Sequence, residues 1–136
     1  MNTPHRHPLR MRTAAALVVA TLLAGCASTD YHYSQLVGRR YFKTNIDTYP
    51  VIILSVDGRS FVGPYPVLVD AGMRDVLLQG PPTVVNLQLT QVMKLDVKPC
   101  TRYYLVAVKQ NPLQNEFTPR VDFEEPIAGC TPAPAK

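Results

Sequence analysis

The chain has 136 residues, of which 46% are hydrophobic and 18% are charged, with 14 basic and 10 acidic side chains, three cysteines and no tryptophan. These values describe one domain and exclude disordered chains, collagen-like chains and chains with helical membrane spans. Residues 1–25 hold three arginines and no acid, which leaves 11 − 10 = +1 for residues 26–136. The charge therefore indicates no nucleic-acid partner.

Residues 1–25 have the pattern of a secretory signal peptide. A polar, arginine-bearing start is followed by an apolar segment, Ala14 to Gly25, whose only polar side chain is Thr21. As a helix this segment would be about 18 Å long, whereas the hydrocarbon layer of a membrane is roughly 30 Å thick. We therefore expect the segment to be cleaved rather than to stay in the membrane.

The end of this segment, Leu23-Ala24-Gly25-Cys26, resembles the lipobox of bacterial lipoproteins. The resemblance implies cleavage before Cys26 and a diacylglycerol and an N-acyl chain on that residue, with no other cofactor. Ala27 rather than an aspartate follows Cys26, which in enterobacterial lipoproteins implies the periplasmic face of the outer membrane. The alternative is an ordinary signal peptide followed by a chance cysteine.

Residues 26–40 are predicted to form a lipidated tether, because Leu36 and Val37 are their only large aliphatic residues. The extended tether can reach about 50 Å from the membrane. Its tyrosines, Tyr31 and Tyr33, together with Tyr41, either pack against the domain or lie at the membrane interface.

From residue 41 onward the pattern is that of β-strands separated by turns. A β-branched run over residues 51–56 ends at Asp57-Gly58, a dipeptide suited to the positive φ angles of a tight hairpin turn. Residues 84–98 alternate apolar and polar side chains, which predicts one long strand or two collinear strands with a bulge near Gln91. The further predicted strands are residues 59–62, 67–69, 74–79, 102–109 and 120–124.

About seven strands in some 90 residues favour an all-β fold, a single antiparallel β-sandwich of immunoglobulin- or transthyretin-like type. The sandwich is predicted over residues 41–130, with residues 131–136 as a disordered tail. Residues 102–109 are apolar on both faces in their middle, which predicts a central strand. In residues 120–124, Val121 and Phe123 should point inward and Asp122 and Glu124 outward.

With Cys26 assigned to lipid, Cys100 and Cys130 remain. An even pair in the oxidising periplasm predicts a disulfide. A zinc site is the alternative, but no CxxC pair is present and His32 is the only histidine after the signal segment, so we expect no metal.

Two further resemblances concern the body of the chain. Residues 56–78 resemble the PEGA type of small β domain in the spacing of Asp57-Gly58, Gly63, Pro66-Val67 and Gly72, although its Pro-x-Gly-Ala opening and Gly-Tyr close are absent. Residues 100–104 with Cys130 are similar to segments of small Gram-negative outer-membrane lipoproteins. Both resemblances imply an envelope β domain of binding or structural character.

The residues predict no catalytic site. A Ser/His/Asp triad would have to use His32 in the tether, and Asp122 and Glu124, about 7 Å apart along a strand, are better explained as a solvated edge. We therefore expect a non-catalytic lipoprotein that binds or scaffolds another envelope protein, with Tyr103 or Tyr104 as candidate contacts. The alternatives are a small-molecule, lipid or glycan binder, and an inhibitor of a hydrolase that uses the loop Asn111 to Thr118.

Overall fold

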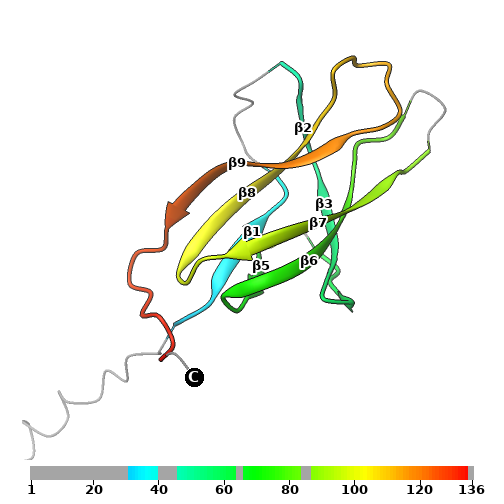
Figure 1. The fold of residues 1–136 in the computed structure, drawn as a ribbon. Coiled ribbons are helices and arrows are strands. Elements are labelled where there is room, and N and C mark those ends of the chain that lie inside the picture. The colour runs from blue at the N-terminus through cyan, green and yellow to red at the C-terminus, as the bar shows by residue number, and fades with distance from the viewer. Residues whose placement is uncertain (1–30, 40–45, 64–65, 84–86, 135–136) are drawn as a thin grey trace, which may run out of the picture.

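The computed structural model describes residues 31–39, 46–63, 66–83 and 87–134, and in them the chain is all-β. The predicted signal peptide, Cys26, Tyr41 and residues 84–86 of the predicted long strand lie outside these residues. The described part holds nine strands in two sheets (Figure 1), whereas the sequence predicted about seven.

The first sheet contains five strands arranged around β8. They are β1 (Ser34–Val37), β2 (Thr48–Pro50), β5 (Val67–Val69), β8 (Thr101–Val108) and β9 (Thr118–Pro126). One edge of β8 pairs with β9, while the other edge pairs first with β1, in parallel, and then with β2, antiparallel. Among the described strands β5 pairs with β1 alone, so it forms an edge of this sheet.

The second sheet has the order β4-β3-β6-β7 and is antiparallel throughout. Its strands are β3 (Ile52–Val56), β4 (Arg59–Ser60), β6 (Gly72–Gln79) and β7 (Thr90–Val97). The predicted turn joins β3 to β4, with positive φ angles of 49° at Asp57 and 77° at Gly58. The two sheets share one hydrophobic core, to which Leu36, Tyr103 and Leu105 contribute from one side and Val76 and Leu78 from the other.

The chain passes from the first sheet to the second at Val51, directly after β2. The Val51 amide donates a hydrogen bond of 2.8 Å to the Gly38 carbonyl, so the end of β1 and the start of β3 lie against each other. A Cβ on Gly38 would lie only 2.2 Å from the Val51 oxygen. This close approach explains why a residue without a side chain occupies position 38.

Residues 34–37 belong to the first sheet, although the sequence pattern placed them in the tether. β1 lies between β8 and β5, and Leu36 is fully buried. The other inward side chain of β1 is Ser34. Its hydroxyl donates to the Lys98 carbonyl at 2.7 Å and accepts from the Thr101 amide at 3.1 Å. A buried serine with two hydrogen bonds is compatible with a core position, but it gives no apolar signal in the sequence.

Most other strand predictions agree with the structure, and two differ. The alternation predicted for residues 84–98 is present in β7, where Leu95 and Val97 are buried, but Leu87 is exposed and lies outside the strand. The inward position predicted for Phe123 is wrong. The pairing of β9 with β8 shifts register between Tyr104 and Leu105, a bulge that places Asp122 between the paired residues Val121 and Phe123. Phe123 therefore lies beside Tyr104 on the outer face and is 42% exposed.

Candidate functional site

The two adjacent tyrosines predicted as candidate partner contacts, Tyr103 and Tyr104, point to opposite faces of the first sheet. Tyr103 points into the core, and its hydroxyl accepts a 2.8 Å hydrogen bond from the Lys98 amide in the turn before β8. Since only 2% of Tyr103 is exposed, it is the core member of the pair, and Tyr104 remains as the candidate contact. Tyr104 points to the opposite, outer face of the same sheet, where it is half-buried.

Tyr104 belongs to a continuous hydrogen-bond network on the outer face of the first sheet. Its hydroxyl donates to Glu125 Oε1 at 2.9 Å, and the same oxygen accepts from Arg102 Nη1 at 2.9 Å. Arg102 Nε donates to Gln35 Oε1 at 2.7 Å, and Gln35 Nε2 donates to the Tyr31 hydroxyl at 2.7 Å. The network crosses β9, β8 and β1 and holds its side chains in fixed positions.

The charged centre of this network is an ion pair between the Arg102 guanidinium and the Glu125 carboxylate. The hydrogen bonds of Arg102 with Tyr104 and Glu125 raise the pKa of the guanidinium further above its usual value, so the group stays charged at every physiological pH. Arginine and tyrosine side chains held in place are typical of protein contact surfaces. The sequence pattern did not single out Arg102, Glu125 or Gln35, because their meeting depends on which strands are neighbours.

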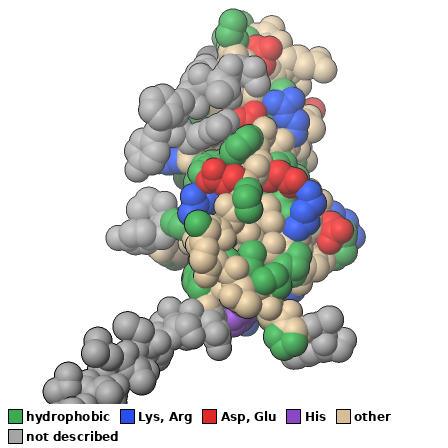
Figure 2. All heavy atoms as spheres, turned by 90° about the vertical axis from the view of Figure 1, so that its left-hand side faces the viewer, with side chains coloured by type: hydrophobic (Ala, Val, Ile, Leu, Met, Phe, Trp, Pro, Cys, Tyr) green, Lys and Arg blue, Asp and Glu red, His purple; other side chains and the backbone are tan. Residues whose placement is uncertain are grey.

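The two β9 carboxylates that the sequence analysis considered, Asp122 and Glu124, each lie beside a basic side chain. Glu124 binds Lys98 Nζ at the surface, and the Asp122 side chain is only 7% exposed, with Oδ1 3.7 Å from Arg120 Nη2. The sequence had placed Asp122 on the solvent face, and the bulge explains the difference. Acidic and basic side chains alternate with hydrophobic ones on this side of the molecule (Figure 2).

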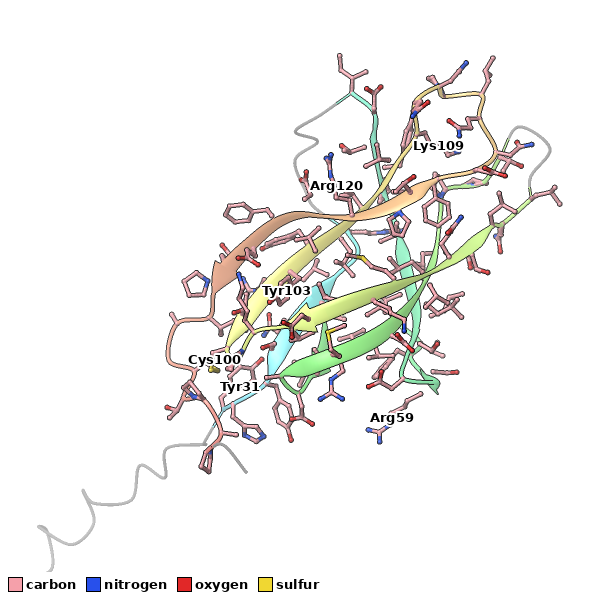
Figure 3. The ribbon with its side chains drawn as sticks, in the orientation of Figure 1. Tyr31, Arg59, Cys100, Tyr103, Lys109 and Arg120 are labelled. Atoms are coloured by element: carbon pink, nitrogen blue, oxygen red, sulfur yellow. A yellow bond between two sulfur atoms is a disulfide. The ribbon has the colours of Figure 1, made fainter. Side chains whose placement is uncertain are left out.

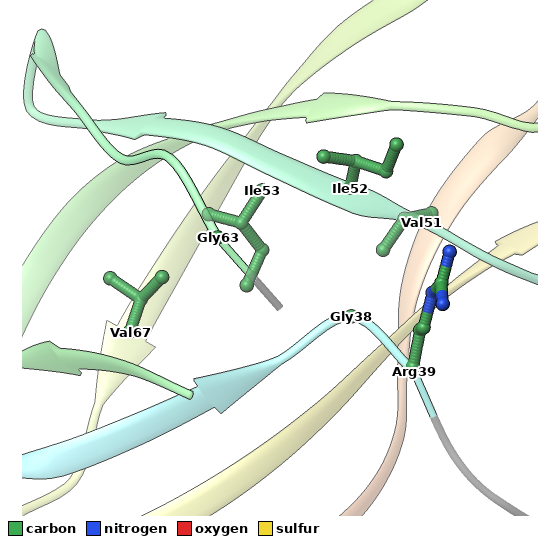
Figure 4. A pocket seen from close by; sticks show the side chains of 7 residues that line it. All are labelled: Gly38, Arg39, Val51, Ile52, Ile53, Gly63 and Val67. Atoms are coloured by element: carbon green, nitrogen blue, oxygen red, sulfur yellow. The ribbon is translucent and has the colours of Figure 1, made fainter. Parts of the chain in front are cut away.

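Two hollows lie beside β5, the edge strand of the first sheet. The first, of about 280 Å³, is lined by the apolar side chains Val51, Ile52, Ile53 and Val67, by Gly38 and Gly63 and by the charged side chain of Arg39 (Figure 4). The second, of about 310 Å³, shares Gly63 and Val67 with the first and is lined further by Phe61, Val62, Pro66 and Leu68. Leu68 in the middle of β5 is 47% exposed, between the buried Val67 and Val69. Among the described residues, the edge strand β5 thus carries an exposed leucine and has two hollows beside it.

A third hollow, of about 280 Å³, lies at the end of the molecule where the described chain begins, and Tyr33 and Arg59 both line it. Here Arg74 joins the turn at Asp57 to the turn at Asp70 and Ala71. It donates to the carbonyls of Asp70 and Ala71 at 3.0 and 2.9 Å and to Asp57 Oδ2 at 3.0 Å. The Asp75 amide donates to Asp57 Oδ1 at 2.9 Å, and this bond, followed by the one from Arg74, lowers the pKa of Asp57.

Cys100 and Cys130 form the predicted disulfide, with their Cα atoms 5.6 Å apart. The bond attaches the segment after β9 to the turn before β8, where the Ile127 amide also donates to the Cys100 carbonyl at 2.8 Å. The Thr131 amide donates to the Tyr31 carbonyl at 2.9 Å, so this segment in turn holds the residues before β1. The first residue of the predicted tail is therefore ordered against the domain.

In the described ranges, no group of three or more histidine, cysteine, aspartate or glutamate side chains is placed to hold a metal ion. No helix long and apolar enough to cross a membrane occurs in the part of the chain that the structure describes. No protein-family model matches the chain, and neither a curated protein nor a solved structure is detectably similar to it.

Proposed function

We propose that this protein is a non-catalytic lipoprotein, anchored by acylated Cys26 to the periplasmic face of the outer membrane, that binds another envelope protein. In this proposal the two-sheet body is a β-sandwich of immunoglobulin- or transthyretin-like type. The address rests on the apolar segment before Cys26 and on its resemblance to a lipobox. The disulfide supports it, because such bonds persist in oxidising compartments such as the periplasm.

The observation that carries the binding function is the edge strand β5 with the two hollows beside it. An extended segment of a partner can add to a sheet edge through backbone hydrogen bonds, while its alternate side chains enter neighbouring hollows. β5 offers such an edge, with Leu68 exposed on it and hollows of about 280 and 310 Å³ beside it. The lipid anchor would raise the concentration of the domain at the membrane where the partner resides.

A small-molecule, lipid or glycan ligand is the alternative function. Sites for such ligands are concave and enclose most of the ligand, with volumes of about 300 to 1,000 Å³. Of the two hollows beside β5, one lies just below this range, at about 280 Å³, and the other at its lower end, at about 310 Å³. They fit side chains of an added strand better than a whole ligand.

Photo-crosslinking in cells tests the proposal with three variants that carry a crosslinking amino acid. Position 68 reports on the β5 edge, position 113 on the loop between β8 and β9, and position 92 on the outer side of the second sheet. Leu68, Leu113 and Val92 are 47%, 71% and 59% exposed, so each replacement leaves the core intact. We expect one recurrent envelope protein to be linked from position 68 but not from position 92.

The identity of the crosslinked protein, and the position from which it is linked, separate the alternatives. Binding of the same partner by the unmodified protein should persist at high salt, because backbone hydrogen bonds and apolar contacts are not screened. Equal linkage from positions 68 and 92, or no protein adduct from position 68, would contradict strand addition at β5. Linkage from position 113 alone would instead support a hydrolase inhibitor that uses the loop.

A further inference from the structure

The start of the described chain is held firmly against the domain, close in sequence to the proposed lipid. The Tyr31 carbonyl accepts from the Thr131 amide at 2.9 Å, and the Tyr31 hydroxyl accepts from Gln35 Nε2 at 2.7 Å. Thr131 is itself next to Cys130 of the disulfide. The chain is therefore fixed from residue 31, not from residue 41 as the predicted tether required.

This fixation limits how far the domain can lie from its anchor. Five residue steps separate Cys26 from Tyr31, and an extended chain advances at most about 3.6 Å per step, so the distance is at most about 18 Å. The headgroup region on one side of a bilayer is several ångströms thick, since the hydrocarbon core is about 30 Å and the whole bilayer about 40 to 45 Å. A domain tied this closely must lie near the headgroups.

The surface next to the anchor has side chains suited to a membrane interface. His32 stacks on Tyr33 with ring centroids 4.1 Å apart, and Tyr31 meets Tyr33 edge-on at 6.3 Å. Tyr33 is 36% exposed and shares its hollow with Arg59, which is exposed and makes no ion pair with the other described residues. Tyrosine rings are typical of the headgroup level, and an exposed arginine is attracted to anionic lipids.

We infer that the end of the domain formed by residues 31–33 and the turn at residues 57–59, which we call the anchor end, lies against the phospholipid surface. This inference rests on the proposed acylation of Cys26. Tyr33 and Arg59 contact the headgroups, whereas the loop between β8 and β9 lies at the opposite end of the molecule and faces away from the membrane (Figures 1 and 3). Leu68 and Val69 of β5 line the same hollow as Tyr33 and Arg59, so β5 then lies close to the membrane.

Single tryptophans test this orientation, because the chain contains none of its own. Three variants, Tyr33→Trp, Arg59→Trp and Leu113→Trp, are extracted from membranes and reconstituted into vesicles of phosphatidylethanolamine and phosphatidylglycerol. The vesicles carry brominated acyl chains, which quench only tryptophans at or within the membrane. We expect Trp fluorescence to be lost at positions 33 and 59 and retained at position 113. Arg59 is exposed in a two-residue strand, so its variant keeps the test valid if Tyr33→Trp fails to fold.

The outcomes distinguish this inference from the proposed function. Intact mass spectrometry of each reconstituted sample shows whether Cys26 carries lipid. Acylated protein in which positions 33 and 59 are not quenched, or in which position 113 is quenched equally, would overturn the orientation while the lipoprotein assignment stands. An unmodified Cys26 would overturn both.

Discussion

At the scale of single residues, Gly38 and Asp57 each make a contact for which their residue type is well suited. Gly38 lets two backbones approach where the chain changes sheets. Asp57 tolerates a positive φ angle and also accepts hydrogen bonds from Asp75 and Arg74. Both contacts are with residues more than ten positions away in the chain, so each links a local conformation to the tertiary structure.

Replacing Gly38 with alanine should lower the free energy of unfolding by about 2 to 3 kcal/mol, because the new Cβ meets a backbone oxygen that can move only with its strand. Gly80→Ala is the matched comparison. Its Cβ would meet the Phe117 ring at 2.5 Å. Because a side chain shifts more easily than backbone, Gly80→Ala should lower the free energy of unfolding less than Gly38→Ala. Urea unfolding measures both variants. Equal losses would contradict the role given to the Val51 carbonyl.

Asp57 should make stability depend on pH in the acid range. Its pKa in the folded protein lies below the ordinary value of 3.8, because the Asp75 amide and Arg74 favour the carboxylate. The stabilisation is therefore complete above pH 3.8 and is lost as the pH falls through the lower, folded-state pKa.

The matched variant for this effect is Asp57→Asn, since asparagine also tolerates the left-handed conformation. The difference in urea midpoint between the native protein and this variant should be constant near neutral pH and shrink below pH 3.8. All other carboxylates contribute equally to both proteins. Parallel midpoints down to the lowest pH would show that Asp57 contributes nothing through its charge.

At the scale of elements, the strand β1 has the largest consequence for the fold. It pairs with β8 on one side and β5 on the other, and it is the only parallel partner in the described sheets. The edge strand β5, on which the proposed function depends, is attached to the sheet only through β1. The proposed binding edge thus depends on a four-residue strand.

Leu36→Ala should lower the free energy of unfolding by about 2 to 5 kcal/mol, because it leaves a cavity at a fully buried position. The same change at Leu113, which is 71% exposed, should have an effect within about 0.5 kcal/mol. Thermal unfolding of the two variants measures the contrast. If residues 34–37 were a solvated tether, both substitutions would be silent.

At the scale of the whole molecule, the disulfide holds the two described ends of the chain together. It joins positions 30 residues apart and so keeps Thr131 beside Tyr31. Cys100 lies near Tyr31 in Figure 3, so the disulfide is at the same end of the molecule as the anchor end. The bond therefore has a structural role in the proposed orientation on the membrane.

Reduction of the disulfide should lower the free energy of unfolding by about 3 to 4 kcal/mol in the chain-entropy model for a loop of this size. Urea unfolding of the oxidised and reduced protein measures the difference. The double variant Cys100→Ser with Cys130→Ser is the control, and reductant should not change its midpoint further. Identical midpoints for oxidised and reduced native protein would show that the bond contributes nothing to stability.

The local pattern of the chain was enough to predict the all-β class, the turn at Asp57-Gly58, the central position of β8 and the pairing of the two cysteines. Strand periodicity and turn chemistry are properties of neighbouring residues, and a sequence displays them directly. The compartment argument for the disulfide is likewise independent of the fold. The predicted lipobox at Cys26 is of the same local kind and stays a prediction.

Only the tertiary structure decided which residues meet. Gln35 and Arg102 are 67 positions apart, and no local pattern indicates their hydrogen bond. Ser34 is buried because two distant backbone groups satisfy its hydroxyl, and Phe123 is exposed because one extra residue in β9 reverses the alternation. Periodicity specifies that a strand has two faces, but strand order, register and bulges determine what those faces contact, and these are set by the packing of the whole chain.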